Sequence, residues 1–333
     1  MEEKIKNFLN NLRKLPRCTN DEHYRFADYM ELKCLVNVDG EYSQSEFIDD
    51  AKQRAEDLGE GDFEENKKIK KLPNSEKNDK WNLIATDTFR VISNRIFQFG
   101  KDYPFKLSQN GKVIVLNENY EENLSYIFLL LCSDLRYTLK FKRELTSSFE
   151  ALSKEVMKEV LPNAEVHLFG SSNTEDGSTE WTSQKLWHKL QWLEGFLKEK
   201  LNVYEKQFSV HDKGDRGLDI VGKIPFNDDL TNFTIIFAQC ACSPHDWSQK
   251  QSDMSASAWR ELISLRTQPN YFMFIPQSFR SSTGNWHDRT KFRETVILDR
   301  YRILGNWKNR DLLKSWTVFP VLKEILESRE TVF

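Results

Sequence analysis

The sequence predicts a mixed α/β protein, with a mixed sheet flanked by helices in its C-terminal part and an α+β region before it. From residue 147 onward, apolar patterns indicate the order helix, strand, helix, strand, strand, helix, strand, which is typical of a sheet covered by helices. The length of 333 residues suggests two domains of roughly 100–200 residues each. We therefore expect an N-terminal region over 1–144 and a second region over 145–333 that ends in a helical extension.

The N-terminal region is expected to contain helices over 3–13, 43–58, 81–99 and 122–135 and strands over 29–38, 103–107 and 112–116. Ser43 with Glu46 three residues later is typical of a capping box at a helix N-terminus. Gly100 is a natural C-cap for the helix over 81–99. The segment 59–79 is almost entirely charged or polar, so we expect an exposed loop there.

The second region is expected to contain helices over 147–161, 182–201 and 255–265, strands over 164–169, 218–224, 233–242 and 271–275, and helical stretches over 289–298 and 308–328. Pro162 ends the first of these helices. The helix over 182–201 is amphipathic, because Leu186, Leu190, Leu193 and Leu197 lie on one side of it.

Composition limits the classes of function. The net charge is only −3, so nucleic-acid binding would need locally clustered lysine and arginine. Five scattered cysteines, an odd number, favour reduced thiols over a disulfide framework. Residues 1–13 lack the apolar core of a secretory signal, and the longest apolar run, 126–132, is far shorter than the roughly 20 residues of a membrane span. We therefore expect a cytoplasmic protein without a membrane partner.

The candidate chemistry lies between residues 214 and 250. Asp219 is embedded in an apolar strand, where a charge is costly unless it binds a metal or a partner. The following strand is apolar up to Ala238 and then reaches Gln239. In a hairpin, Asp219 and Gln239 would converge at one end of the sheet. Two oxygen donors at this position suit Mg²⁺.

The run Gly-Asp-Arg-Gly-Leu-Asp-Ile over 214–220, followed by an apolar strand ending in Gln-Cys-Ala over 239–241, resembles the PD-(D/E)XK nuclease superfamily. The resemblance is closest to the Mrr-like branch and covers about residues 145–280. It implies a restriction-endonuclease-like αβββαβ core that cleaves DNA with Mg²⁺ (or Mn²⁺). It also implies that Asp219 is the metal-binding acid, that Gln239 replaces the second acid, and that Glu150 is the additional helix acid.

The sequence departs from the Gln-x-Lys pattern of that branch, because the lysine position is Ala241. Lys250, or Lys223 on the Asp219 strand, is the nearest substitute for the missing ammonium group. Alternatively, the site is inactive and Lys250 is a surface lysine.

The chain is also similar to uncharacterised bacterial proteins associated with phage defence. The shared features are Gln-Cys-Ala at 239–241, Asp-Trp at 246–247, Lys250, and Asp-Arg at 299–300. This similarity implies a role in an antiphage system, together with a partner protein subunit.

The candidate acids also have structural interpretations. Asp219 would cap a turn or pair with Arg216 or Lys223, and Gln239 would satisfy a backbone group. Glu150, three residues after the Ser at 147, fits a capping box.

Other catalytic classes find little support. The spacing of Cys240, Cys242 and His245 is not a usual zinc spacing, and buried cysteines on a strand are expected instead. A Cys-His nucleophilic pair would lack a third, orienting residue. The chain contains no phosphate-binding G-x-x-x-x-G-K-[ST] loop, so it does not resemble an NTPase.

A basic, aromatic-containing edge is expected near the C-terminus. Its candidate members are Arg300, Arg302, Trp307, Lys308 and Arg310. Arginine and tryptophan together suit phosphate and base contacts. They equally suit a protein interface or an internal ion pair.

The preferred hypothesis is a metal-dependent DNA endonuclease that hydrolyses phosphodiester bonds as the effector of an antiphage system. A second hypothesis is a catalytically inactive scaffold or adaptor subunit of a multi-protein defence complex, which Ala241 and the near-neutral charge favour. A third is a nucleic-acid sensor that binds without cutting. DNA and a partner subunit are thus the expected partners.

Overall fold

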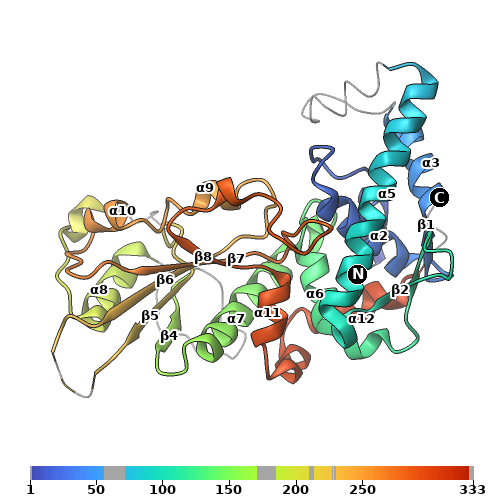
Figure 1. Ribbon diagram of the computed structural model, residues 1–333. Helices are drawn as coiled ribbons and strands as arrows, with labels where there is room; N and C mark the ends of the chain where they lie inside the picture. The colour runs from blue at the N-terminus through green and yellow to red at the C-terminus, as the bar shows by residue number, and fades with distance from the viewer. Residues whose placement is uncertain are drawn as a thin grey trace. The chain divides into compact units, whose positions relative to one another are not determined.

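The computed structural model describes residues 2–55, 72–170, 185–209, 214–226, 228 and 230–329. Two compact units make up the chain, which Figure 1 colours from blue at the N-terminus to red at the C-terminus. The first unit comprises Met1–Lys142, Gln277–Arg289 and Phe319–Phe333, and the second comprises Arg143–Pro276 and Thr290–Val318. The division at residue 142 lies close to the expected boundary at 144. The segments 277–289 and 319–333 join the first unit, where Phe279 packs against Tyr24 with ring centroids 5.3 Å apart.

The first unit combines helices with a small antiparallel sheet. The helices are α1 (Glu2–Asn11), α2 (His23–Val36), α3 (Gln44–Ala55), α5 (Asn74–Phe99), α6 (Leu124–Cys132) and α12 (Phe319–Glu327), with short 3₁₀ turns η1 (Gly100–Asp102), η2 (Tyr120–Asn123) and η3 (Leu139–Phe141). The sheet has the order β1-β3-β2, formed by β1 (Glu41–Ser43), β2 (Phe105–Leu107) and β3 (Val113–Leu116). Helix α12 packs against α2 and α6.

Local sequence signals predicted most of these elements correctly. The backbone N of Ser43 donates to Glu46 at 2.6 Å, and the backbone N of Glu46 donates to Ser43 Oγ at 3.1 Å, so the capping box that begins α3 is confirmed. Gly100 follows α5 with a φ of 52°, which confirms its role as C-cap. Helix α5 begins at Asn74, inside the segment expected as a loop, while 56–71 lie outside the described residues.

The strand predicted over 29–38 is wrong, because most of these residues belong to helix α2. Every residue of α2 from Tyr24 to Val36 is buried. A helix that is buried all round has no polar face, so its sequence shows no amphipathic period. Without that period, the apolar stretch at its end reads as a buried strand.

The charged residues of α2 are buried together with their partners. The Nη1 atom of Arg95, on α5, lies 2.7 Å from Asp28 and 2.6 Å from Glu31. The hydroxyl groups of Tyr103 and Tyr126 donate to the same Glu31 carboxylate at 2.6 and 2.9 Å. These charge-assisted hydrogen bonds compensate the desolvation of the carboxylates.

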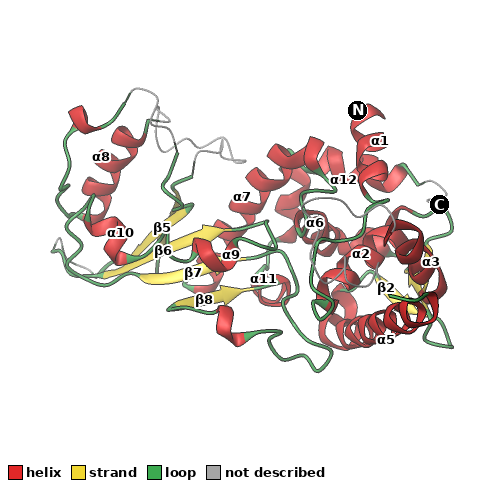
Figure 2. Ribbon diagram, turned by 90° about the horizontal axis from the view of Figure 1, so that it is seen from above, coloured by secondary structure: helices red, strands yellow, loops and turns green. Residues whose placement is uncertain are grey.

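The second unit is built on a five-stranded mixed sheet of order β4-β5-β6-β7-β8, and Figure 2 shows β5 to β8 side by side in this order. Its strands are β4 (Glu165–Leu168), β5 (Ile220–Ile224), β6 (Thr234–Cys240), β7 (Asn270–Phe274) and β8 (Thr295–Leu298). The β4/β5 and β5/β6 pairs are antiparallel, and the β6/β7 and β7/β8 pairs are parallel. The expected mixed sheet flanked by helices is therefore confirmed.

The helix predicted over 289–298 is wrong, because its second half forms strand β8. Thr295 to Leu298 pair in parallel with Tyr271 to Phe274 of β7. Short apolar runs do not distinguish a strand from a helix by periodicity, and the β-branched residues here fit a pleated surface.

The helices of the second unit cover both faces of this sheet. They are α7 (Lys142–Val160), α8 (Leu186–Leu197), α9 (Trp247–Lys250), α10 (Ala256–Arg260) and α11 (Arg300–Asn306), with 3₁₀ turns η4 (Glu205–Gln207), η5 (Arg289–Lys291) and η6 (Arg310–Ser315). His167 and Phe237 lie on one face, because both pair with Val221. His167 contacts Trp192 of α8, and Phe237 contacts Trp259 of α10, so these helices cover that face. Within the described ranges, no helix combines the length and apolar character needed to cross a membrane.

We predict that Arg95→Ala lowers the free energy of unfolding of the first unit by about 3–5 kcal/mol, because it leaves two buried carboxylates uncompensated. Urea denaturation measures this change. Arg90→Ala is the matched control on the same helix. Arg90 pairs with Asp87 at 2.6 Å but is 66% exposed, so the loss should be roughly 0–1 kcal/mol. Equal losses in the two variants would contradict a stabilising role for the buried network.

Candidate active site

Two of the predicted acids meet at Gly170, directly after strand β4. A Cβ atom placed on Gly170 would lie 2.9 Å from Glu150 Oε2 and 3.6 Å from Asp219 Oδ1. Glu150 comes from α7, and Asp219 immediately precedes β5. The backbone N atoms of Phe169 and Gly170 donate to the Asp219 carbonyl at 2.7 and 3.1 Å, which holds these segments together. A residue without a side chain leaves space for both carboxylates.

The capping-box interpretation of Glu150 is wrong. Helix α7 begins at Lys142, so Ser147 and Glu150 both lie inside the helix rather than at its N-terminus. The half-buried Glu150 side chain instead reaches the end of the sheet.

Asp219 lies in an environment that disfavours its ionised form. Its Oδ2 atom accepts a 2.7 Å hydrogen bond from the backbone N of Cys240, the last residue of β6. Burial raises its pKa well above the ordinary value of 3.8, and the nearby carboxylates of Glu150 and Asp215 raise it further. The Cys240 hydrogen bond and Lys250 act in the opposite direction. The site therefore concentrates negative charge that its own hydrogen bonds do not fully offset.

Gln239 reaches the same end of the sheet from strand β6. Its neighbour Ala238 pairs with Ile220 and accepts a hydrogen bond from the Asp219 backbone N at 3.0 Å. The Gln239 side chain is buried, and its Nε2 atom lies 2.9 Å from where a Cβ on Gly217 would be. Its Oε1 atom is buried without a hydrogen-bond partner among the described residues. A buried carbonyl in this state is costly, and a cation or a water molecule would relieve it.

Lys250, the predicted substitute for the missing lysine, lies near enough to Asp219 to influence its carboxyl group electrostatically. It is the last residue of α9, it is half-buried, and its charge lowers the pKa of Asp219. Lys223, the other candidate, pairs with Glu165 at 3.2 Å and donates to the Phe196 carbonyl, so it is engaged elsewhere.

The structure adds Lys189, which the sequence analysis did not single out. This residue of α8 is fully buried, and its Nζ donates to the carbonyls of Phe169 at 3.1 Å and Gly170 at 2.9 Å. Burial lowers its pKa, while Asp215, Glu150 and Asp219 oppose this effect. One feature of the sequence could have identified Lys189. It lies on the same side of helix α8 as the buried leucines, and a lysine on a buried apolar face needs a specific partner.

The oxygen donors of this site fit a hard divalent cation. No group of three or more His, Cys, Asp or Glu side chains is arranged to hold a metal ion in the part of the chain that the structure describes. The donors at the sheet end are instead the carboxylates of Glu150 and Asp219 and the amide oxygen of Gln239. Magnesium binds carboxylate and amide oxygens and usually keeps several waters, so it needs few protein ligands. A cation here would offset the repulsion between the two carboxylates.

The expected surface edge near the C-terminus is wrong for two of its residues. Arg300 is fully buried, and its Nε donates to the Pro276 carbonyl at 2.8 Å. Trp307 is buried and stacks on Trp316 with ring centroids 5.7 Å apart.

The remaining cations of that edge are also engaged with the protein. Arg302 donates to the Ile297 carbonyl and Arg310 to the Leu304 carbonyl, both at 2.8 Å. Lys308 is exposed and pairs with Glu159. Arg300, Arg302 and Arg310 therefore each hydrogen-bond to backbone carbonyls of their own unit.

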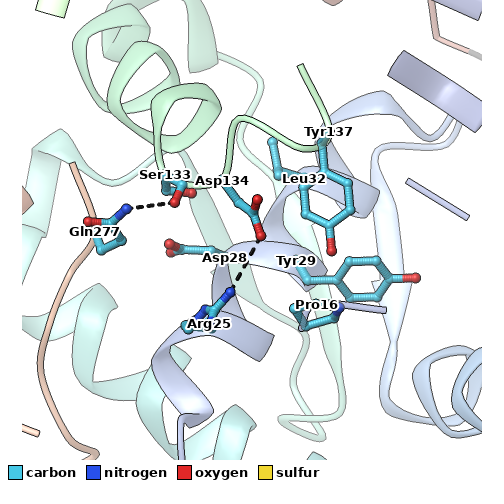
Figure 3. Close-up of a pocket in the computed structure, with 9 residues that line it drawn as sticks. All are labelled: Pro16, Arg25, Asp28, Tyr29, Leu32, Ser133, Asp134, Tyr137 and Gln277. Atoms are coloured by element: carbon cyan, nitrogen blue, oxygen red, sulfur yellow. Dashed lines mark hydrogen bonds and ion pairs between the residues drawn. The ribbon is translucent and has the colours of Figure 1, made fainter. Parts of the chain in front are cut away.

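The first unit contains a small polar cavity, shown in Figure 3. Arg25 pairs with Asp134 beside it at 3.5 Å, and Gln277 donates to the Ser133 carbonyl at 2.7 Å. Its volume of about 10 Å³ is that of one water molecule, so it offers no room for a substrate.

We predict that Asp219→Asn stabilises the protein at neutral pH in the absence of divalent cations. Because the folded-state pKa of Asp219 is raised, the folded wild type loses stability as the pH rises from 3.8 through that higher pKa. Asparagine cannot ionise and keeps an oxygen for the Cys240 hydrogen bond. The difference in urea midpoint between the two proteins should therefore grow between pH 4 and pH 8. A difference that does not change with pH would contradict the raised pKa.

Comparison of the chain with protein-family models, with curated proteins and with solved structures finds no match. The function is therefore inferred from the residues of the site and their chemistry.

Proposed function

We propose that this protein is a metal-dependent nuclease that hydrolyses phosphodiester bonds of DNA. The observation that carries the proposal is that Glu150 and Asp219 both approach Gly170, beside a buried Gln239 carbonyl that has no hydrogen-bond partner in the described part of the chain. The mixed sheet with α7 before it is compatible with the restriction-endonuclease-like core that the sequence resemblance implies.

Glu150, Asp219 and Gln239 would hold Mg²⁺ or Mn²⁺. When bound, such an ion supplies a Lewis acid for the phosphate oxygens and lowers the pKa of the attacking water. The Cys240 backbone N fixes one Asp219 oxygen, and the other oxygen lies beside Gly170, as the Glu150 carboxylate does.

The two lysines have different proposed roles. Lys250 is only half-buried, so its ammonium group is accessible to a phosphate bound at the site. There it would stabilise the charge that develops in the transition state. Lys189 is fully buried and bonds to two backbone carbonyls, so it acts as a positioning residue that holds Phe169 and Gly170 beside the carboxylates.

We predict that Asp219→Ala abolishes cleavage of plasmid and linear DNA in Mg²⁺ or Mn²⁺, and that Lys250→Ala lowers its rate roughly 10²- to 10³-fold, as loss of a transition-state donor does. Lys158→Ala removes an exposed lysine of the same unit that pairs with Glu155, so it is the matched control and should retain activity. Cleavage that survives Asp219→Ala would refute the proposed site. The assay is repeated with the products of neighbouring genes, because an antiphage effector is expected to act with a partner subunit.

We also predict that Gly170→Ala weakens Mn²⁺ binding by at least tenfold while changing stability little. The added Cβ displaces the Glu150 carboxylate, and the far end of a glutamate side chain moves at small cost. Isothermal titration calorimetry measures the binding. Gly195→Ala on α8 is the control, because a Cβ there meets no atom of the described residues within 4 Å and binding should not change. Equal Mn²⁺ affinity of Gly170→Ala and the wild type would place the cation elsewhere.

The main alternative is an inactive scaffold or adaptor of a defence complex. It is favoured by Ala241, which is buried at the lysine position of the resemblance and carries no charge. An inactive scaffold would bind no Mn²⁺ through Asp219. A nucleic-acid sensor, the third hypothesis, would bind DNA with a steep salt dependence that survives Asp219→Ala.

A further inference from the structure

A second feature of the same unit lies next to the carboxylates. A pocket of about 410 Å³ is lined by Arg216, Asp253, Ala258, Trp259, Glu261 and Leu262. This volume lies within the roughly 300–1,000 Å³ of small-molecule sites. The pocket combines one cation and two carboxylates with apolar wall residues, among them the buried Trp259 and Leu262.

A tight turn connects this pocket with the proposed active site. A Cβ on Gly217 would lie 2.7 Å from Asp253 Cβ and 2.9 Å from Gln239 Nε2, so the turn touches both places. Asp219 follows two residues later. A nucleotide with its base in the pocket therefore has its phosphate within reach of the carboxylate cluster.

Arg216 occupies this turn in a conformation that its residue type disfavours. Leu218 N donates to the Asp215 carbonyl at 3.1 Å, and the two central residues, Arg216 and Gly217, have φ values of 54° and 76°. Glycine or asparagine is preferred at such positions. The geometry of the turn therefore gives no reason for an arginine at position 216. A role of its guanidinium group in the pocket would be such a reason.

The polar groups of the pocket select among ligands. Asp253 and Glu261 would repel a phosphate, and Arg216 beside them suits a neutral ligand that both accepts and donates hydrogen bonds. Guanine suits both the arginine and the carboxylates of the pocket. Its O6 and N7 atoms accept from arginine, and its N1–H and N2–H groups donate to a carboxylate. Adenine lacks the O6 acceptor, and thymine lacks an amino donor. The Trp259 indole N–H donates to the Asp253 backbone carbonyl at 3.1 Å, and this bond helps to hold Asp253 in place.

We propose that this pocket binds a guanine base adjacent to the scissile phosphate, with Arg216 on its O6/N7 edge and Asp253 or Glu261 on its amino edge. This inference rests on the proposed function for the identity of the substrate. The recognition itself does not require cleavage.

The first test is isothermal titration calorimetry of the full chain with guanosine and adenosine monophosphates, without metal. The expected result is at least tenfold tighter binding of the guanosine nucleotide. Arg216→Asn should abolish that preference while keeping or raising the urea midpoint, because asparagine suits the turn. Arg266→Asn, an exposed arginine outside the pocket, should bind as the wild type does. Equal affinity for the two nucleotides, no binding of either, or an unchanged preference in Arg216→Asn would overturn the inference.

The second test maps the ends of cleaved DNA. Cuts next to guanine that spread to all bases in Arg216→Asn support the pocket. Cuts that depend on Asp219 but occur equally at every base would overturn it and leave the hydrolysis intact. Preferential guanosine nucleotide binding with no DNA cleavage in any condition would instead refute the proposed function and support the pocket.

Discussion

Repulsion between two carboxylates is the constraint on which the proposed site depends. Glu150 lies in helix α7 and Asp219 immediately before strand β5, far apart in the chain, yet both carboxylates approach Gly170. A side chain at position 170 would occupy that space, and without a compensating charge the two acids resist ionising together. The hydrogen bond from Cys240 to Asp219 and the bond from the buried Lys189 to Gly170 hold this arrangement. A divalent cation would compensate the negative charge of the two carboxylates.

In the first unit, by contrast, the buried carboxylates are paired with an arginine. There, Arg95 contacts both Asp28 and Glu31, and two tyrosine hydroxyls complete the hydrogen bonds of Glu31. A network of this kind specifies and stabilises a core. In the second unit, Glu150 and Asp219 are half-buried beside the Gln239 amide oxygen, which has no hydrogen-bond partner among the residues that the structure describes. This is the condition expected of a ligand site rather than of a core.

The sequence and the structure agree most closely where the chemistry is local. The polar residues Asp219 and Gln239 beside two apolar strands and the capping box of α3 were all readable from neighbouring residues, although strand β5 begins only after Asp219. Agreement fails where burial overrides the pattern. Helix α2 loses its amphipathic period because it is buried all round, and Arg300 and Trp307 look like surface residues but are packed inside.

Residue types and their spacing along the chain were enough to predict a mixed sheet flanked by helices and to single out Asp219, while Glu150 became a candidate only through the resemblance to the nuclease superfamily. Packing determined which side chains meet. It placed Glu150 inside α7 rather than at a cap, brought Lys189 from the leucine stripe of α8 to Gly170, and formed the pocket beside Arg216. These contacts join residues distant in the chain, so they depend on strand register and on the burial of whole helices, which a pattern of neighbouring residues does not encode.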